Sequence, residues 1–145
     1  MQSSWLSFDE TMSYVLTSTS LLKYNSASPA FSSYHTFSGV TFSAGSTITV
    51  FSSNILVASA NASSCSAYAL VDNGTALTQF FTHSSTGYSS TPTLKTSPQL
   101  SKFLIHGISS GNLASYFYHL DFSNQTSSII TFPSTSVFDP SSILM

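Results

Sequence analysis

Ser109 lies in the one stretch of this sequence that fits a catalytic motif. Residues 107–111, Gly-Ile-Ser-Ser-Gly, match the G-x-S-x-G pattern of a hydrolase nucleophile elbow. The side chains that could complete a triad with Ser109 are His83, His106, His119, Asp121 and Asp139. An elbow needs a turn from a strand into a helix, and the chain lacks the strand–helix alternation that builds such a sheet. With 35 serines the pattern also arises by chance, so we expect Ser109 to be a turn hydroxyl.

Carboxylates and histidines offer few other sites for chemistry. Glycosidases usually need two carboxylates, one on each side of the scissile bond. The chain has five Asp or Glu residues and no pair among them stands out. Asp72 is expected to be part of a hairpin turn. His119 and Asp121 alternate onto one face of an expected strand, which would suit two ligands of a cation. A solvated polar face is the simpler interpretation. We therefore expect neither enzymatic activity nor a cofactor, although calcium bound through backbone carbonyls stays open.

Aromatic and polar side chains in expected loops are candidates for binding a sugar. Glycan sites usually present aromatic faces to the apolar faces of the rings, with polar groups around them. Trp5, Tyr34 and Tyr88 lie in or near expected loops, although a lone Trp more often fills a core. Tyr88 has only small or polar neighbours and is expected to be exposed, with His83 beside it. Together with the His119 and Asp121 pair, these residues form the predicted ligand site.

The composition favours a neutral partner. Of the 145 residues, 52 are Ser or Thr and eight carry a formal charge, comprising three Lys, no Arg and five Asp or Glu. Nucleic-acid binding is not expected, because affinity for phosphates comes largely from clustered Lys and Arg. A hydroxyl-rich surface suits a glycan or glycoprotein better, and a homo-oligomer stays open.

Signals for membranes and secretion are weak. No apolar run approaches the roughly 20 residues of a membrane span. The first residues, MQSSWLSFDETM, carry acids where a signal peptide has a basic segment, which indicates a leaderless protein or a piece of a longer secreted chain. Sequons begin at Asn61, Asn73 and Asn124, and such triplets also arise by chance in this composition. We favour an extracellular or cell-surface location. Cys65 is expected to be a buried, unpaired thiol.

Short β-like runs separated by Ser, Gly, Asn and Pro recur along the chain. They predict one all-β domain over residues 1–145, an antiparallel, jelly-roll-like β-sandwich of about eight strands. The runs cover residues 13–16, 34–42, 47–51, 67–71, 75–81, 103–106, 115–122 and 129–132. Asn73-Gly74 predicts a two-residue type I′ hairpin turn. Residues 84–100 are expected to form a long loop, whereas period-two alternation over 114–122 predicts a strand.

The order of these runs resembles the galactose-binding-domain-like β-sandwich of fungal surface and secreted proteins, over about residues 34–122. The resemblance depends on STITVFSS at 46–53, SAYALVDNGTALTQFF at 66–81 and HGISSGNLASYFYHLDF at 106–122. The chain departs from that pattern at Ser52, where a Gly is expected, and in an inserted Ala- and Ser-rich segment, ILVASANASSCS. The resemblance implies a carbohydrate-binding or adhesive role without naming site residues.

These observations lead to three functional hypotheses. The first is a non-catalytic, lectin-like carbohydrate-binding or adhesive module. The second is a structural assembly protein, such as a viral capsid or spike domain, which low charge and a Ser/Thr coat would also suit. The third is a small esterase that uses Ser109.

Overall fold

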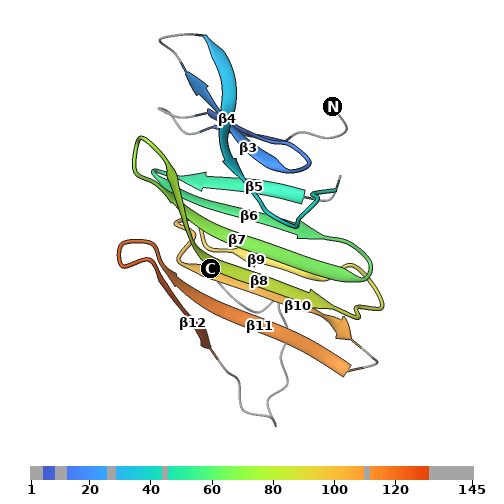
Figure 1. The fold of residues 1–145 in the computed structure, drawn as a ribbon. Coiled ribbons are helices and arrows are strands. Elements are labelled where there is room, and N and C mark those ends of the chain that lie inside the picture. Colours follow the sequence, from blue (N-terminus) through green and yellow to red (C-terminus); the bar gives the residue numbers. More distant parts are fainter. Residues whose placement is uncertain (1–4, 9–12, 26–28, 44–45, 110–111, 131–145) are drawn as a thin grey trace.

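The computed structural model describes residues 5–8, 13–25, 29–43, 46–109 and 112–130, which form twelve strands and no helix (Figure 1). The strands make three antiparallel sheets. Sheet A contains β1 (Trp5–Phe8), β2 (Ser13–Leu16), β3 (Ser20–Asn25) and β4 (Ala30–Thr36). Sheet B contains β5 (Ser46–Phe51), β6 (Asn54–Ala60), β7 (Ser64–Asp72) and β8 (Leu77–Thr86). Sheet C contains β9 (Thr93–Thr96), β10 (Lys102–Ser109), β11 (Asn112–Asp121) and β12 (Thr126–Ile130).

Each sheet is a simple meander. In all three sheets the hydrogen-bonded neighbours follow one another along the chain, and every pairing is antiparallel. Short turns suffice to connect such strands, which suits a chain so rich in Ser, Asn and Gly. The prediction of an all-β sandwich-like fold is confirmed. The expected count of about eight strands was too low, and the described strands lack the crossovers of a jelly roll.

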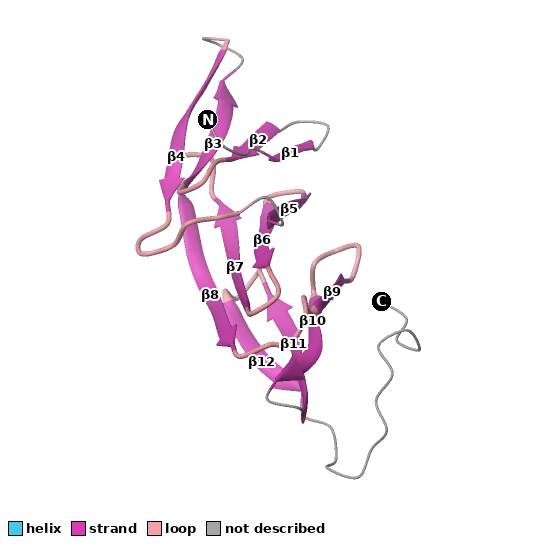
Figure 2. Ribbon diagram, turned by 90° about the vertical axis from the view of Figure 1, so that its right-hand side faces the viewer, coloured by secondary structure: helices cyan, strands magenta, loops and turns pink. Residues whose placement is uncertain are grey.

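Sheet B is the central layer, because its inner strands β6 and β7 are buried on both faces. Along β6, Leu56, Ala58 and Ala60 enter a core shared with sheet C, whereas Ile55 and Val57 enter a core shared with sheet A. The alternation of side chains along a strand produces this division. Figure 2 shows β7 and β8 running from the neighbourhood of sheet A to that of sheet C.

The connection from β4 to β5 completes the core between sheets A and B. The rings of Phe37 and Phe42 lie 5.0 Å apart, and both contact the ring of Tyr68 on β7. The backbone N–H groups of Phe37 and Phe42 donate to the carbonyls of Thr19 and Ser18, in the turn between β2 and β3. The expected single strand over 34–42 was therefore wrong, since β4 ends at Thr36 and the following residues bond to that turn.

The strands expected from the sequence included neither β6 nor β9. The Ala- and Ser-rich segment ILVASANASSCS contains most of β6 and the start of β7, and both strands are buried on two faces. A strand covered on both sides shows no alternation of polar and apolar residues, so the pattern that marks a half-buried strand is absent. The expected loop over 84–100 contains the end of β8 and all of β9, which pairs with residues 103–106 of β10.

Candidate functional site

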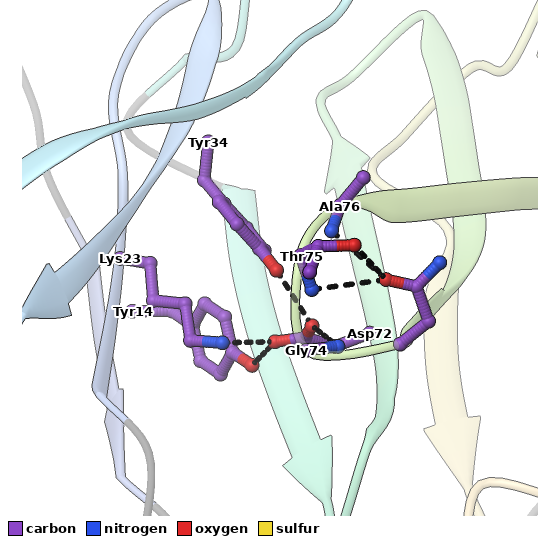
Figure 3. Close-up of polar contacts among 8 residues, drawn as sticks. Tyr14, Lys23, Tyr34, Asp72, Gly74, Thr75 and Ala76 are labelled. Carbon is purple, nitrogen blue, oxygen red and sulfur yellow. Dashed lines mark hydrogen bonds and ion pairs between the residues drawn. The ribbon is translucent and has the colours of Figure 1, made fainter.

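Asp72, the last residue of β7, is the centre of the largest polar cluster among the described residues (Figure 3). Its carboxylate accepts hydrogen bonds from the Tyr14 hydroxyl, from Lys23 Nζ at 2.7 Å and from the Tyr34 hydroxyl at 2.7 Å. The backbone N–H of Gly74 donates to the same carboxylate at 2.8 Å. Three of these donors come from β2, β3 and β4, so one carboxylate joins sheet A to the β7–β8 hairpin.

A β-bulge in β4 directs Tyr34 toward Asp72. Leu21 of β3 pairs with His35 and Leu22 pairs with Ser33, which leaves Tyr34 as the extra residue. Such a residue turns its side chain away from the regular alternation of the strand. The sequence identified Tyr34 as a ligand-binding residue in or near a loop. The structure places it instead in a strand, with its hydroxyl bound to a buried carboxylate.

The environment of Asp72 keeps its carboxylate ionised. Burial acts to raise the pKa of Asp72, but the hydrogen bonds from Lys23, Tyr14, Gly74 and Tyr34 outweigh it and hold the pKa below its usual value. Burial and the bond to this carboxylate raise the pKa of Tyr34. The Lys23 ammonium also lies 4.7 Å from the centre of the Tyr34 ring. A carboxylate with four donors and a lowered pKa is a poor proton acceptor, so this cluster is structural.

The turn beside Asp72 is a hairpin, as predicted, but of another type. Asp72 pairs with Leu77, which leaves the four residues 73–76 in the loop. A type I′ turn needs a positive φ at both central residues, whereas in residues 73–76 only Gly74, at 96°, has one. Asn73 instead accepts hydrogen bonds through Oδ1 from the backbone N–H groups of Thr75 and Ala76, at 3.0 and 2.9 Å.

A second cluster connects sheets B and C through His83 of β8. Its Nδ1 lies 2.7 Å from the Tyr118 hydroxyl of β11, and its Nε2 lies 2.8 Å from Ser85 Oγ. Ser85 Oγ in turn lies 2.7 Å from the Tyr88 hydroxyl. The imidazole also packs edge-on against the Tyr116 ring, with centroids 4.7 Å apart. The sequence placed His83 and Tyr88 near each other, and the structure joins them through Ser85.

Burial limits the chemistry of this second cluster. His83 is 5% exposed, and this desolvation lowers its pKa. Its two partners are neutral hydroxyls, so the cluster lacks the carboxylate that stabilises a catalytic imidazolium in a triad. Burial likewise raises the pKa of the neighbouring Cys65 thiol to about 11. The expectation that Tyr88 is exposed was wrong, because its ring is 5% exposed within the core between sheets B and C.

The position of the Tyr88 ring explains the first glycine of the G-x-S-x-G match. A Cβ atom on Gly107 would lie 2.7 Å from two carbons of that ring, so no larger residue fits beneath it. Gly107 and Ser109 belong to β10, where Ser109 pairs with Asn112 of antiparallel β11. The antiparallel pairing of β10 with β11 excludes a strand-to-helix elbow, as the strand-to-strand interpretation predicted. The expectation that Ser109 is a turn hydroxyl was wrong, because Ser109 is the last residue of β10.

The other predicted site residues do not meet in one place. His119 and Asp121 of β11 share the face of sheet C opposite Tyr118, as the alternation predicted. His119 is exposed, whereas Asp121 accepts hydrogen bonds from the backbone and side chain of Asn124, which lower the pKa of Asp121. Trp5 is the first residue of β1, and its side chain lies outside what the structure describes. The described residues contain no group of three or more potential metal ligands.

A groove of about 180 Å³ lies between the edge strands of sheets B and C, β5 and β9. Its walls carry hydroxyls and its floor is apolar, and none of its lining residues is charged. The lining residues are Thr47, Thr49, Leu56, Ala58, Leu94, Thr96 and Phe103. Thr47 and Thr49 pair with Ala58 and Leu56, which explains why these four side chains share one face of sheet B.

The same row of side chains continues beyond the groove. Phe51 follows Thr47 and Thr49 at period two along β5, and it is 44% exposed. Its pairing partner is Asn54, whose side chain shares this face. Sequence reasoning missed these residues. The period-two spacing of Thr47, Thr49 and Phe51 is visible in the sequence. The opposite wall of the groove, on β9, is more than 40 positions later in the sequence and lies in a segment that was expected to be a loop, so the groove could not be predicted.

Comparisons with known proteins add no family. No protein-family model and no curated protein matches the chain. The resemblance to galactose-binding-domain-like modules therefore stays a prediction. Among the described residues there is no helix long and apolar enough to cross a membrane.

Proposed function

We propose that the protein is a non-catalytic carbohydrate-binding module that holds a neutral glycan in the groove between β5 and β9. The observation that carries this proposal is the uncharged groove itself, with Thr47, Thr49 and Thr96 on its walls and the exposed Phe51 further along the same face. The proposal extends the lectin-like hypothesis from the sequence but moves the site away from the residues named there.

The groove offers the two kinds of contact that a sugar needs. A threonine hydroxyl donates one hydrogen bond and accepts others, so it can bind sugar hydroxyls in either direction. Leu94 and the exposed part of the Phe51 ring present apolar surface to the C–H face of a sugar ring. The volume of about 180 Å³ suits one ring of a longer glycan, whose neighbouring rings would extend along β5 toward Phe51.

The two polar clusters support a binding role over catalysis. Asp72 is occupied by four donors, and His83 is bound to two neutral hydroxyls within the core. Neither group faces the groove. A formal net charge of −2 with only three cations gives no electrostatic reason to bind a strongly acidic polymer.

A glycan array followed by titration of the bound glycan tests this function. Thr49→Val keeps the shape of the side chain and removes the hydroxyl, so we expect the affinity to fall about 3- to 10-fold. Phe51→Ala removes a half-exposed ring and should weaken binding about 10-fold. Calorimetry or surface plasmon resonance on the full chain measures both changes.

Two matched variants serve as controls. Thr78→Val removes an exposed hydroxyl on β8, and Phe31→Ala removes a ring on β4 that is 41% exposed. Neither residue lines the groove, so both variants should bind like the wild type. If the controls lose affinity as much as the groove variants do, the glycan binds elsewhere and the proposed site is wrong.

The structure also offers one observation in favour of the assembly hypothesis. β12 is an edge strand of sheet C, all five of its residues are exposed and none is charged. Ile129 and Ile130 are 51% and 38% exposed. An exposed, uncharged edge strand can pair with a strand of another chain. Light scattering with size-exclusion chromatography distinguishes the hypotheses, because an assembly protein forms a large symmetric particle without any glycan.

A further inference from the structure

Two of the three sequons form the same local structure at the ends of β7. Asn61 lies in the turn between β6 and β7, and its Oδ1 accepts from the backbone N–H and the hydroxyl of Ser63, at 2.9 and 3.1 Å. Asn73 lies in the turn between β7 and β8, and its Oδ1 accepts from the backbone N–H and hydroxyl of Thr75, both at 3.0 Å. Each sequon hydroxyl is thus bonded to the oxygen of its own asparagine.

This arrangement leaves the amide nitrogen of each asparagine unengaged. Both asparagines are exposed, and within the described part of the chain no group accepts a hydrogen bond from Nδ2 of Asn61 or Asn73. The two residues are at opposite ends of a nine-residue strand, roughly 30 Å apart. Neither lines the groove between β5 and β9. A bulky group on either nitrogen would project into solvent without disturbing a core.

The third sequon is different. Asn124 lies in the turn between β11 and β12, and its Nδ2 donates to Asp121 Oδ2 at 2.8 Å. Its backbone N–H donates to the other oxygen of the same carboxylate at 3.0 Å. The Asn124 nitrogen is therefore held against a carboxylate and turned toward its own hairpin.

We propose that Asn61 and Asn73 are N-glycosylation acceptors of the folded protein and that Asn124 is not. In this reaction Nδ2 attacks the anomeric carbon of an oligosaccharide carried on a lipid diphosphate. The new N–C bond forms as the bond from that carbon to the diphosphate oxygen breaks. The lipid diphosphate leaves with the bonding electron pair, and one proton of the amide passes to a base of the transferase. This inference is independent of glycan binding in the groove.

The test uses the full chain, folded and purified from a host without N-glycosylation. A single-subunit eukaryotic oligosaccharyltransferase and a lipid-linked oligosaccharide are added, and intact mass counts the glycans. We expect two glycans on the wild type. Ser63→Ala and Thr75→Ala, which keep the asparagines and their bonds to the backbone, should each remove one glycan. Thr126→Ala, the matched change in the Asn124 sequon, should remove none.

A gain of modification makes the test sharper. Asp121→Ala removes the acceptor that holds Asn124 Nδ2, so we expect this variant to receive a third glycan. If a variant fails to fold, peptide mass spectrometry of the modified wild type locates its glycans directly. The proposal is overturned if the folded chain receives no glycan at Asn61 and Asn73 while a control sequon peptide is modified. It is equally overturned if Asn124 of the wild type is modified as fully as the other two.

Discussion

The Asp72 carboxylate provides the sharpest prediction about stability. Asp72→Asn keeps the size of the side chain but replaces one oxygen by an NH₂ group and removes the charge. Oδ1 of the new amide can still accept hydrogen bonds from Tyr34 and Gly74. Its NH₂ group faces the Lys23 ammonium, and because both groups are donors they cannot form a hydrogen bond with each other. The substitution thus breaks the ion pair and weakens the remaining bonds.

The size of the effect follows from the burial of the pair. The Asp72 side chain is fully buried, whereas that of Lys23 is 21% exposed and can partly regain water. Removing one partner of a fully buried pair costs about 3–5 kcal/mol, so the exposed part of Lys23 places the loss near the lower end, at about 3 kcal/mol. For a chain of this length that corresponds to a fall in Tm of about 10 °C. Lys23→Met should cost at least as much, about 3 kcal/mol, because it leaves the fully buried Asp72 carboxylate with neutral donors and no counter-charge.

Urea unfolding followed by far-UV circular dichroism measures these losses. With a slope of about 2 kcal/mol/M, the midpoint of Asp72→Asn should fall by about 1.5 M. The difference in free energy of unfolding between the wild type and Asp72→Asn should decrease as the pH falls below about 3.8. The lowered pKa of Asp72 means that the unfolded chain binds its proton first, so the stabilisation is present above that pH and is lost below it. A loss under about 1 kcal/mol at neutral pH would refute the structural role assigned to Asp72.

Three further predictions concern the core between sheets B and C. Gly107→Ala should cost at least about 2 kcal/mol in urea unfolding, since its Cβ would overlap the Tyr88 ring, and adding Tyr88→Ala should recover part of that cost. The pKa of His83 is lowered in the folded protein, so the unfolded chain takes up the proton first as the pH falls. We therefore expect the stability to decline below about pH 6.5. Melting curves recorded over a pH series should show this decline for the wild type and not for His83→Gln. The Cys65 thiol, with a raised pKa of about 11 and 1% exposure, should react with a thiol reagent only as the protein unfolds, so a fast reaction under native conditions would contradict its burial.

Local sequence patterns correctly predicted strands and turns that depend on neighbouring residues in the sequence. The alternation over 114–122 identified β11 and the face that His119 and Asp121 share, and Asn73-Gly74 marked the β7–β8 hairpin. The type of that turn was not predictable from the dipeptide, because Asp72 and Asn73 accept hydrogen bonds from loop N–H groups and so stabilise a four-residue loop.

The candidate site depends on contacts between distant segments, which local patterns do not reveal. Lys23 reaches Asp72 across 49 positions of sequence, and the groove joins Thr49 of β5 to Thr96 of β9. The sequence pattern also failed to identify β6 as a strand. Because β6 is buried on both faces, its residues do not alternate between polar and apolar. Tyr88 was expected to be exposed since its neighbours are polar, yet Gly107 leaves the space that buries its ring.

The most direct test of the proposed function is a titration of the methyl-labelled full chain with a glycan found on the array, followed by nuclear magnetic resonance. Binding in the groove predicts that the largest shifts occur at the methyl groups of Thr47, Thr49, Leu94 and Thr96, which line it. Saturating shifts there, with a titration midpoint about 3- to 10-fold higher in Thr49→Val, would support the account. The account would be contradicted if no neutral glycan is bound, or if the shifts gather on the opposite face of sheet C around His119.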